Sequence, residues 1–258
     1  MMKKAFQIVE FARYLLKSEH WRGHGVHSPF MYSFVRNTLM KASKKPNASR
    51  YTTELRKIAP KSVAKSSFGA SPSNESESTA RLLQKISISP KYGKLLNTIV
   101  CNYSPKEVLE LGSGLGVSSY YLANSNPNSH VVTVEGMKAY AEIAQATFKN
   151  LGIANVSVVT STFDEFFDPL APTQKFDLIF IDGAHSYEAT LKNFERSLSV
   201  ATPEAFIILD DIRWSEGMLR AWNEVKQHPK VRVSTDLGRV GILFLNPVLQ
   251  KQEYQIRY

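Results

Sequence analysis

Short apolar segments alternate with amphipathic segments through the second half of the chain. From residue 106 onward, five runs rich in Val, Ile, Leu and Phe are separated by stretches with apolar residues at helical spacing. Apolar strands joined by amphipathic helices are typical of a parallel sheet that is covered on both faces. The expected strands are residues 107–111, 130–135, 155–160, 176–182 and 205–210, and the expected helices are about 116–125, 137–151, 186–200 and 214–227.

The final segment predicts a change of strand direction. Residues 231–234 and 240–245 are apolar, and the short Gly-containing segment between them is typical of a hairpin. The last two strands are therefore expected to be antiparallel. Together, these patterns predict an α/β fold with a doubly wound, Rossmann-like sheet of seven strands, of which the last is antiparallel.

The first part of the chain is expected to be helical. Residues 1–76 are interpreted as a basic helical extension or lid, and residues 77–258 as the α/β domain. Helical spacing predicts a helix over 5–18, and Ser28 followed by Pro29 predicts the start of another, because Ser caps a helix and Pro fits its first turn. Further helices are expected near 51–58, 77–87 and 91–103, and the polar loop over residues 66–75 is interpreted as a linker or mobile lid.

The composition narrows the class of protein. With 43% hydrophobic and 21% charged residues, the chain is expected to be an ordinary soluble globular protein. No apolar run approaches the roughly 20 residues of a membrane span, and the first residues lack a signal-peptide pattern, so no membrane partner is expected. A single cysteine, Cys101, excludes an internal disulfide framework and predicts a cytoplasmic location.

The net charge of +9 is unevenly distributed. Residues 1–66 contain 14 Lys and Arg against three Glu, whereas the remainder contains 18 basic and 20 acidic residues. A basic front could face RNA, but these residues are scattered, which favours a solvated helical surface.

Three alternate glycines follow the first expected strand, within the sequence Glu110-Leu111-Gly112-Ser113-Gly114-Leu115-Gly116. Glycine permits a sharp turn and leaves no Cβ atom over it, so a ligand can approach the backbone and the start of the next helix. Glu135 ends the second strand, roughly 20 residues after the glycines, where a carboxylate can bind a ribose diol. The combination predicts a nucleoside-bearing cofactor.

The spacing of the glycines distinguishes two such cofactors. A dinucleotide fingerprint is G-x-G-x-x-G, whereas Gly116 stands only two residues after Gly114. Glu110, two residues before the first glycine, would repel a pyrophosphate but would attract the cationic groups of S-adenosyl-L-methionine. We therefore favour S-adenosyl-L-methionine over NAD.

Residues 106–245 resemble the class I S-adenosylmethionine-dependent methyltransferases. The stretch from Glu110 to Gly116 matches that family's first motif, Glu135 matches its ribose-binding acid, and the terminal hairpin is similar to its antiparallel seventh strand. The resemblance implies a set of residues around the cofactor: Glu110, Gly112, Ser113, Gly114, Gly116, Glu135, Ser161, Thr162 and Asp182. An acid is common in the family at the position of Ser161, which is a departure.

Three carboxylates are expected at one edge of the sheet. Asp182 ends the fourth strand, and Asp210 and Asp211 end the fifth. Oxygen ligands of this kind suit Mg²⁺ or another divalent cation, and His185 is near enough in sequence to act as a general base with Asp182. The pattern is similar to catechol, caffeoyl-coenzyme A and sugar O-methyltransferases. The alternative is that these acids cap helices or hold loops.

Other residues are candidates for binding the methyl acceptor. Arg22, His24 and His27 belong to a Gly-containing loop, and Trp214 follows Asp211. The alternative interpretations are a helix-entry loop and the start of an amphipathic helix.

We expect O-methylation of a small-molecule hydroxyl. Methylation of RNA such as tRNA, an NAD-dependent oxidoreductase and a non-catalytic nucleotide-binding protein remain alternatives, and a homodimer is left open.

Overall fold

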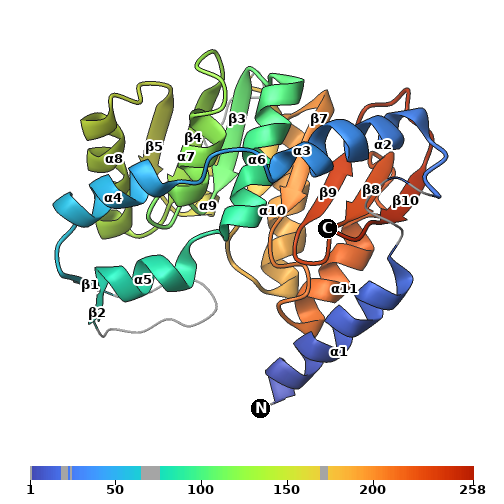
Figure 1. Ribbon diagram of the computed structural model, residues 1–258, viewed down its shortest axis with the longest axis horizontal. Coiled ribbons are helices and arrows are strands. Elements are labelled where there is room, and N and C mark those ends of the chain that lie inside the picture. The colour runs from blue at the N-terminus through green and yellow to red at the C-terminus, as the bar shows by residue number, and fades with distance from the viewer. Residues whose placement is uncertain (1, 19–22, 24, 65–75, 169–173) are drawn as a thin grey trace. The chain divides into compact units, whose positions relative to one another are not determined.

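The computed structural model describes residues 2–18, 23, 25–64, 76–168 and 174–258. Its backbone groups into two compact units, one formed by residues 41–171 and the other by residues 1–40 together with 172–258. Neither boundary falls at residue 76, and the division into an extension and an α/β domain stays a prediction. Each unit is described separately below (Figure 1).

Residues 41–171 contain a parallel three-stranded segment of sheet in the order β3-β4-β5. β3 and β4 are buried along most of their length and consist mainly of Val and Leu, with Glu110 and Thr133 as buried polar residues. The three strands confirm the prediction almost to the residue. The strands are β3 (Glu107–Leu111), β4 (His130–Glu135) and β5 (Val156–Thr160), and the helices that follow them are α7 (Val117–Ala123), α8 (Lys138–Leu151) and α9 (Phe163–Phe167).

The described residues between 41 and 106 contain several short helices, and the linker or lid predicted at residues 66–75 lies outside the described residues. The predicted short helix near residue 51 is confirmed, and Tyr51 on it is fully buried. The Tyr51 hydroxyl donates a hydrogen bond of 2.8 Å to the carbonyl of Leu115, and its ring packs against Tyr120 and Phe148. The elements here are α3 (Met40–Ala42), α4 (Ser49–Ile58), β1 (Ser62–Ala64), β2 (Ser76–Ser78), α5 (Thr79–Ile86) and α6 (Pro90–Tyr103).

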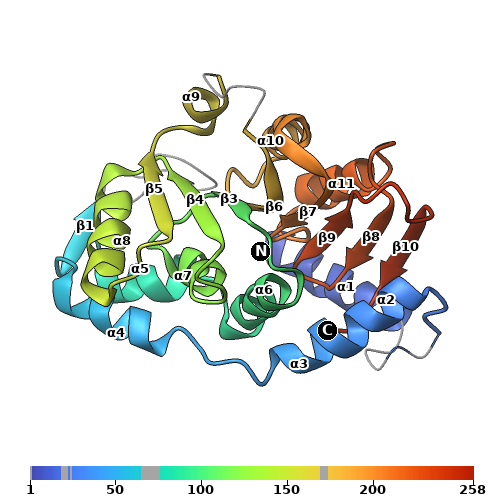
Figure 2. The same cartoon turned by 90° about the horizontal axis from the view of Figure 1, so that it is seen from above.

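The other unit contains five strands in the order β10-β8-β9-β7-β6 (Figure 2). β6 and β7 are parallel, whereas β9 runs antiparallel to both β7 and β8, so the predicted hairpin is confirmed. β10 pairs in parallel with β8 and was not predicted. The strands are β6 (Phe176–Ile181), β7 (Ala201–Leu209), β8 (Val233–Asp236), β9 (Gly241–Phe244) and β10 (Gln252–Gln255).

The helices of this unit begin as the sequence predicts. Ser28 caps the second helix and Pro29 occupies its first turn, and Ser186 and Ser215 cap the helices after β6 and β7. The helices are α1 (Met2–Lys17), α2 (Pro29–Phe34), the π-helical turn η1 (Val35–Leu39), α10 (Tyr187–Val200) and α11 (Glu216–Val225). Among the described residues, no helix is both long enough and apolar enough to cross a membrane.

Candidate functional site

The glycine turn leaves β3 in a conformation that favours glycine at each alternate position. Gly112, Gly114 and Gly116 have φ angles of +97°, +52° and +81°. A Cβ atom at Gly116 would lie 2.3 Å from the Tyr51 hydroxyl oxygen, so a larger residue would overlap α4. The turn is therefore specified both by its backbone angles and by the buried tyrosine packed against it.

Glu135, at the end of β4, holds this turn. Its carboxylate accepts hydrogen bonds of 2.8 Å from the backbone N–H groups of Gly114 and Met137. Burial raises the pKa of Glu135, and the two backbone donors oppose that shift. Each carboxylate oxygen can accept a further hydrogen bond, so the bonds to the turn leave acceptor capacity for a ribose diol.

Glu110 is a fully buried acid on β3 beside the same turn. Its Oε2 atom accepts hydrogen bonds from the hydroxyl groups of Ser119 and Thr133. Its Oε1 atom is buried and has no hydrogen-bond partner among the residues that the structure describes. Burial raises the pKa of Glu110, while nearby hydroxyl groups oppose the shift. A buried acid with one unmatched oxygen suits a cationic ligand group.

Ser161 and Thr162 follow β5, but their side chains already serve the local structure. The Ser161 hydroxyl donates to the Thr162 carbonyl at 2.9 Å. Thr162 caps α9 and forms a capping box with Glu165. The predicted contact with an adenine therefore stays a prediction.

A second group of polar residues gathers in the other unit, where β7 ends. Asp210 is fully buried, and its two oxygens accept hydrogen bonds from Arg239 Nε at 2.8 Å and Arg239 Nη2 at 2.6 Å. Arg239 Nε also lies 3.0 Å from an oxygen of Asp211. Arg239 comes from the turn between β8 and β9, and its carbonyl accepts the Ile212 N–H at 2.9 Å, which fastens this turn to the segment after β7.

Arg239 remains positively charged in this environment. Burial lowers the pKa of Arg239, but the carboxylates of Asp210, Asp211 and Asp182 outweigh burial and raise it overall. The Arg239 side chain is 34% exposed, so part of it remains accessible at the surface.

This arrangement does not fit the predicted divalent cation. Asp182, Asp210 and Asp211 were expected to be its ligands, but a guanidinium pairs with both oxygens of Asp210. In the described part of the chain, no group of three or more His, Cys, Asp or Glu side chains could hold a metal ion. The spacing of the acids predicted a cluster of negative charge at this edge, and the cation paired with it is Arg239.

His185 and Asp182 lie next to one another after β6. His185 Nε2 is 3.9 Å from an oxygen of Asp182, and the His185 ring centroid is 6.2 Å from that of Trp214. Ala184 and Asp211, both in this region, have φ angles of +53°, which is uncommon for residues other than glycine. Strained backbone of this kind concentrates at functional sites.

The predicted acceptor-binding loop is only partly described. Arg22 and His24 lie outside the described residues, and the side chain of His27 is exposed just before the cap of α2. Trp214 is placed beside His185, and its carbonyl accepts a hydrogen bond of 3.0 Å from the Gln7 side chain on α1. Its role in binding an acceptor stays a prediction.

Comparison with known proteins shows which proteins this chain resembles. Residues 109–212 match the sequence model of a family described as "Methyltransferase domain". The chain is 31% identical over 144 residues to a catechol O-methyltransferase from Mycobacterium tuberculosis, a match that covers 55% of this chain and 64% of that protein. It is 28% identical over 131 residues to a catechol O-methyltransferase from Niastella koreensis, which covers 49% of this chain and 58% of that protein. The chain thus spans less than two thirds of either relative.

A solved structure supports the same fold. The O-methyltransferase from Bacillus cereus in complex with SAH superposes with a TM-score of 0.60 at 20% identity, covering 81% of this chain and 96% of that chain. The chain therefore has the α/β fold of that structure, which agrees with the resemblance drawn from the glycine turn and the alternating strands and helices.

Proposed function

We propose that this chain transfers a methyl group from S-adenosyl-L-methionine to a hydroxyl group of a small molecule. The observation that carries the proposal is the pair of buried acids, Glu110 and Glu135, on either side of a turn of three alternate glycines. The similarity to two catechol O-methyltransferases supports a hydroxyl acceptor, and the SAH in the Bacillus cereus structure supports the cofactor.

Residues 41–171 supply the groups that would bind the cofactor. The unmatched Oε1 of Glu110 would attract the cationic end, and Glu135 would accept hydrogen bonds from the ribose. Gly112, Ser113, Gly114 and Gly116 would leave the backbone open to the methionine part. The bound cofactor would supply a methyl group already activated by a sulfonium, so the chain has chiefly to orient a nucleophile and exclude water.

The unit that contains β6 and β7 supplies the groups for the acceptor. His185 would accept the proton of the acceptor hydroxyl, and Asp182, 3.9 Å away, would stabilise the imidazolium that forms. The exposed part of Arg239 would donate hydrogen bonds to the oxygen as negative charge develops on it. In this proposal a fixed guanidinium has the place that the sequence assigns to a divalent cation.

The decisive experiment is a turnover assay with a catechol and other small hydroxyl compounds, in which S-adenosylhomocysteine is measured with and without EDTA. We expect product in both conditions. Stabilisation of the fold by NAD and not by S-adenosylmethionine would contradict the proposal, as would cofactor binding without turnover on any hydroxyl compound. RNA binding with a steep salt dependence and methyl transfer to tRNA would favour the RNA alternative. Size-exclusion chromatography would measure whether the chain is a monomer or a homodimer in solution.

A further inference from the structure

The amphipathic helix α1 is turned with its apolar face outward. Glu10 and Tyr14 are buried at 8% and 1% exposure, whereas Ile8 and Leu16 are 70% and 87% exposed. A helix on the surface of a globular protein normally has the opposite arrangement, with its apolar stripe against the core. The exposed apolar face is therefore a feature that requires an explanation.

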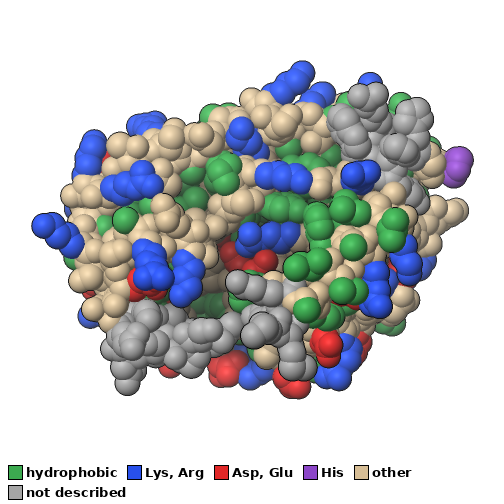
Figure 3. Space-filling model, turned by 60° about the horizontal axis from the view of Figure 1, so that its bottom comes forward, with side chains coloured by type: hydrophobic (Ala, Val, Ile, Leu, Met, Phe, Trp, Pro, Cys, Tyr) green, Lys and Arg blue, Asp and Glu red, His purple; other side chains and the backbone are tan. Residues whose placement is uncertain are grey.

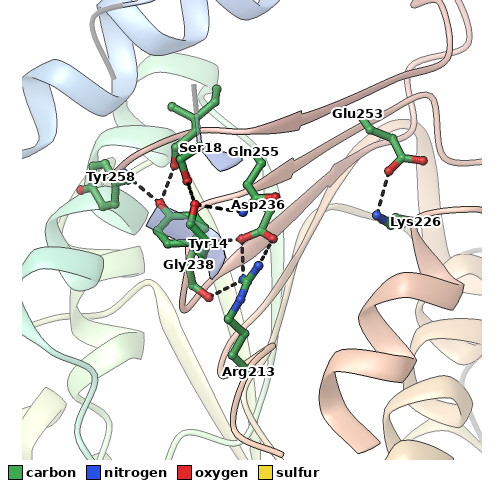
Figure 4. A network of polar contacts seen from close by, with 10 residues as sticks. Tyr14, Ser18, Arg213, Lys226, Asp236, Gly238, Glu253, Gln255 and Tyr258 are labelled. Atoms are coloured by element: carbon green, nitrogen blue, oxygen red, sulfur yellow. Dashed lines mark hydrogen bonds and ion pairs between the residues drawn. The ribbon is translucent and has the colours of Figure 1, made fainter. Parts of the chain in front are cut away.

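Polar contacts hold the inner face of α1 in place (Figure 4). The Tyr14 hydroxyl donates to the Ile256 carbonyl at 2.6 Å and accepts the Tyr258 N–H at 3.0 Å. The guanidinium of Arg213 lies 5.0 Å from the centre of the Tyr14 ring and forms an ion pair with Asp236. The Gln7 side chain adds a hydrogen bond to the Trp214 carbonyl. These contacts fix which side of the helix faces outward.

The outer face forms one continuous apolar stripe, visible in Figure 3 as the hydrophobic side chains over α1. The exposed residues recur at intervals of three and four, which places them on one side of the helix. They are Ala5, Ile8, Val9, Ala12 and Leu16, with Phe11 at the edge of the stripe. A contiguous exposed patch of this kind marks a surface that binds another apolar surface.

The charge of α1 and of the residues around it indicates what kind of surface binds the apolar stripe. α1 contains four basic residues and one acidic residue, and residues 1–66 contain 14 basic residues against three acidic ones. The exposed side chains of Arg13 and Lys17 border the stripe. A second copy of the chain would bring two strongly basic regions together, which is unfavourable. An anionic surface would attract the basic region of a single chain.

We propose that α1 docks in the plane of an anionic lipid membrane, with its apolar stripe inserted at the interface and its basic residues among the headgroups. An apolar helix face with basic flanks is the arrangement that binds membrane surfaces without crossing them. The overall composition predicts no membrane partner, and the orientation of α1 is the observation that changes this expectation.

The test is co-sedimentation of the full chain with vesicles of phosphatidylcholine alone and of phosphatidylcholine mixed with phosphatidylglycerol. We expect binding to the mixed vesicles, weaker binding in high salt, and little binding to phosphatidylcholine. The double substitution Ile8→Glu with Leu16→Glu should weaken binding at least about a hundredfold, because each buried side chain of this size contributes about a tenfold factor or more.

Val248→Glu is the matched control, because Val248 is 83% exposed and lies outside α1. This variant should bind as the unmodified chain does, and circular dichroism should show that all variants are folded. Equal binding to neutral and anionic vesicles, or unchanged binding by the double variant, would overturn the proposal. A dimer in solution that the double variant dissociates, with no vesicle binding, would instead assign the stripe to a second copy of the chain.

Discussion

Glu135 Oε2 accepts a hydrogen bond of 2.8 Å from the backbone N–H of Gly114, which joins the end of β4 to the turn that follows β3. The same carboxylate accepts the Met137 N–H through its other oxygen. The acid expected to bind a ribose therefore also fixes the glycine turn before any ligand is present. Its loss should affect both the binding of the cofactor and the stability of the chain.

Replacing Glu135 with Gln should therefore weaken cofactor binding and reduce stability together. A Gln side chain has one acceptor oxygen, so one of the two backbone N–H groups would lose its partner at a cost of about 1–3 kcal/mol. We expect an affinity for S-adenosylmethionine at least about tenfold lower, since a hydrogen bond to a charged group contributes about 1.5–3 kcal/mol. Isothermal titration calorimetry and urea denaturation measure the two effects. Glu107→Gln, at the other end of β3, is the control and should retain full affinity.

Glu110 should make cofactor binding depend on pH. Its pKa is raised above the ordinary value of 4.5 by burial, so the carboxylate that attracts a cation is lost as the pH falls through this raised pKa. Affinity for S-adenosylmethionine should fall over that range. Glu110→Gln should bind about tenfold or more weakly at neutral pH and have a flatter profile. A profile for Glu110→Gln that matches the unmodified chain would contradict a role for this acid.

The cofactor-free chain should show the opposite trend in stability. Because the folded pKa of Glu110 is higher than the unfolded pKa, its contribution to the free energy of unfolding is fully present below pH 4.5 and is lost as the pH rises through the folded pKa. Glu110→Gln removes this loss of stability, because an amide does not ionise as the pH rises. The variant should therefore be at least as stable as the unmodified chain at neutral pH, although it binds the cofactor less well.

Arg239 should be essential for stability as well as for turnover. Arg239→Ala would leave the fully buried Asp210 without its ion pair, and breaking a buried pair costs about 3–5 kcal/mol. Arg220→Ala is the control, because Arg220 is an exposed side chain that packs over the ring of Tyr187 and its removal should cost less than about 1 kcal/mol. Chemical denaturation compares the two variants.

Arg239→Lys separates charge from geometry. Lysine keeps the positive charge but loses the two-pronged contact with Asp210, so we expect a folded protein with reduced kcat. EDTA should leave the turnover of the unmodified chain unchanged. A requirement for Mg²⁺ would show that Arg239 does not replace the cation.

His185 should act on the rate and not on cofactor binding. His185→Gln should lower kcat by about 10² to 10⁴ if the imidazole removes the acceptor proton. Asp182→Asn should also lower kcat, because it removes the charge 3.9 Å from the imidazole. His130→Gln is a suitable control, since His130 contacts Glu107 and Ser157. Steady-state kinetics with a titration of S-adenosylhomocysteine would separate the two effects, and an unchanged kcat would exclude His185 as the base.

Tyr51 and Gly116 should be energetically coupled. Tyr51→Phe removes the hydrogen bond to the Leu115 carbonyl and should cost about 1–3 kcal/mol, because a buried acceptor loses its partner. Gly116→Ala would strain a φ of +81° and place a Cβ atom 2.3 Å from the Tyr51 hydroxyl oxygen. Removing the hydroxyl relieves part of this overlap. A double-mutant cycle should therefore give a coupling energy of about 0.5–3 kcal/mol, and strict additivity would contradict the contact.

The elements that the sequence predicts well are those whose signal is local. Short runs rich in Val, Ile, Leu and Phe mark the strands from β3 to β7, although β7 begins at Ala201, before the predicted strand 205–210, and the glycine turn is contained within seven consecutive residues from Glu110 to Gly116. β10 was missed because Gln252–Gln255 contains three polar residues and one tyrosine, so it has no apolar run and is recognised only by its pairing with β8.

The parts of the site that could not be predicted depend on contacts between distant residues. Arg239 is 29 positions from Asp210, and Tyr51 is 64 positions from Leu115. No spacing rule connects either pair, so the sequence pattern indicated neither that Arg239 pairs with Asp210 nor that Tyr51 packs against the glycine turn. The periodicity of α1 predicted an amphipathic helix, but periodicity does not state which side faces the core.

The contacts of Tyr14 have a consequence for how the chain folds. The Tyr14 hydroxyl and the Ile256 carbonyl are separated by 242 positions, so α1 is synthesised well before the segment on which it docks. Until then, both faces of this helix are exposed on a nascent chain. Contacts of such long range form slowly because the loop must be closed first. A chaperone or a lipid surface that occupies the apolar stripe during synthesis would protect the nascent chain from aggregation.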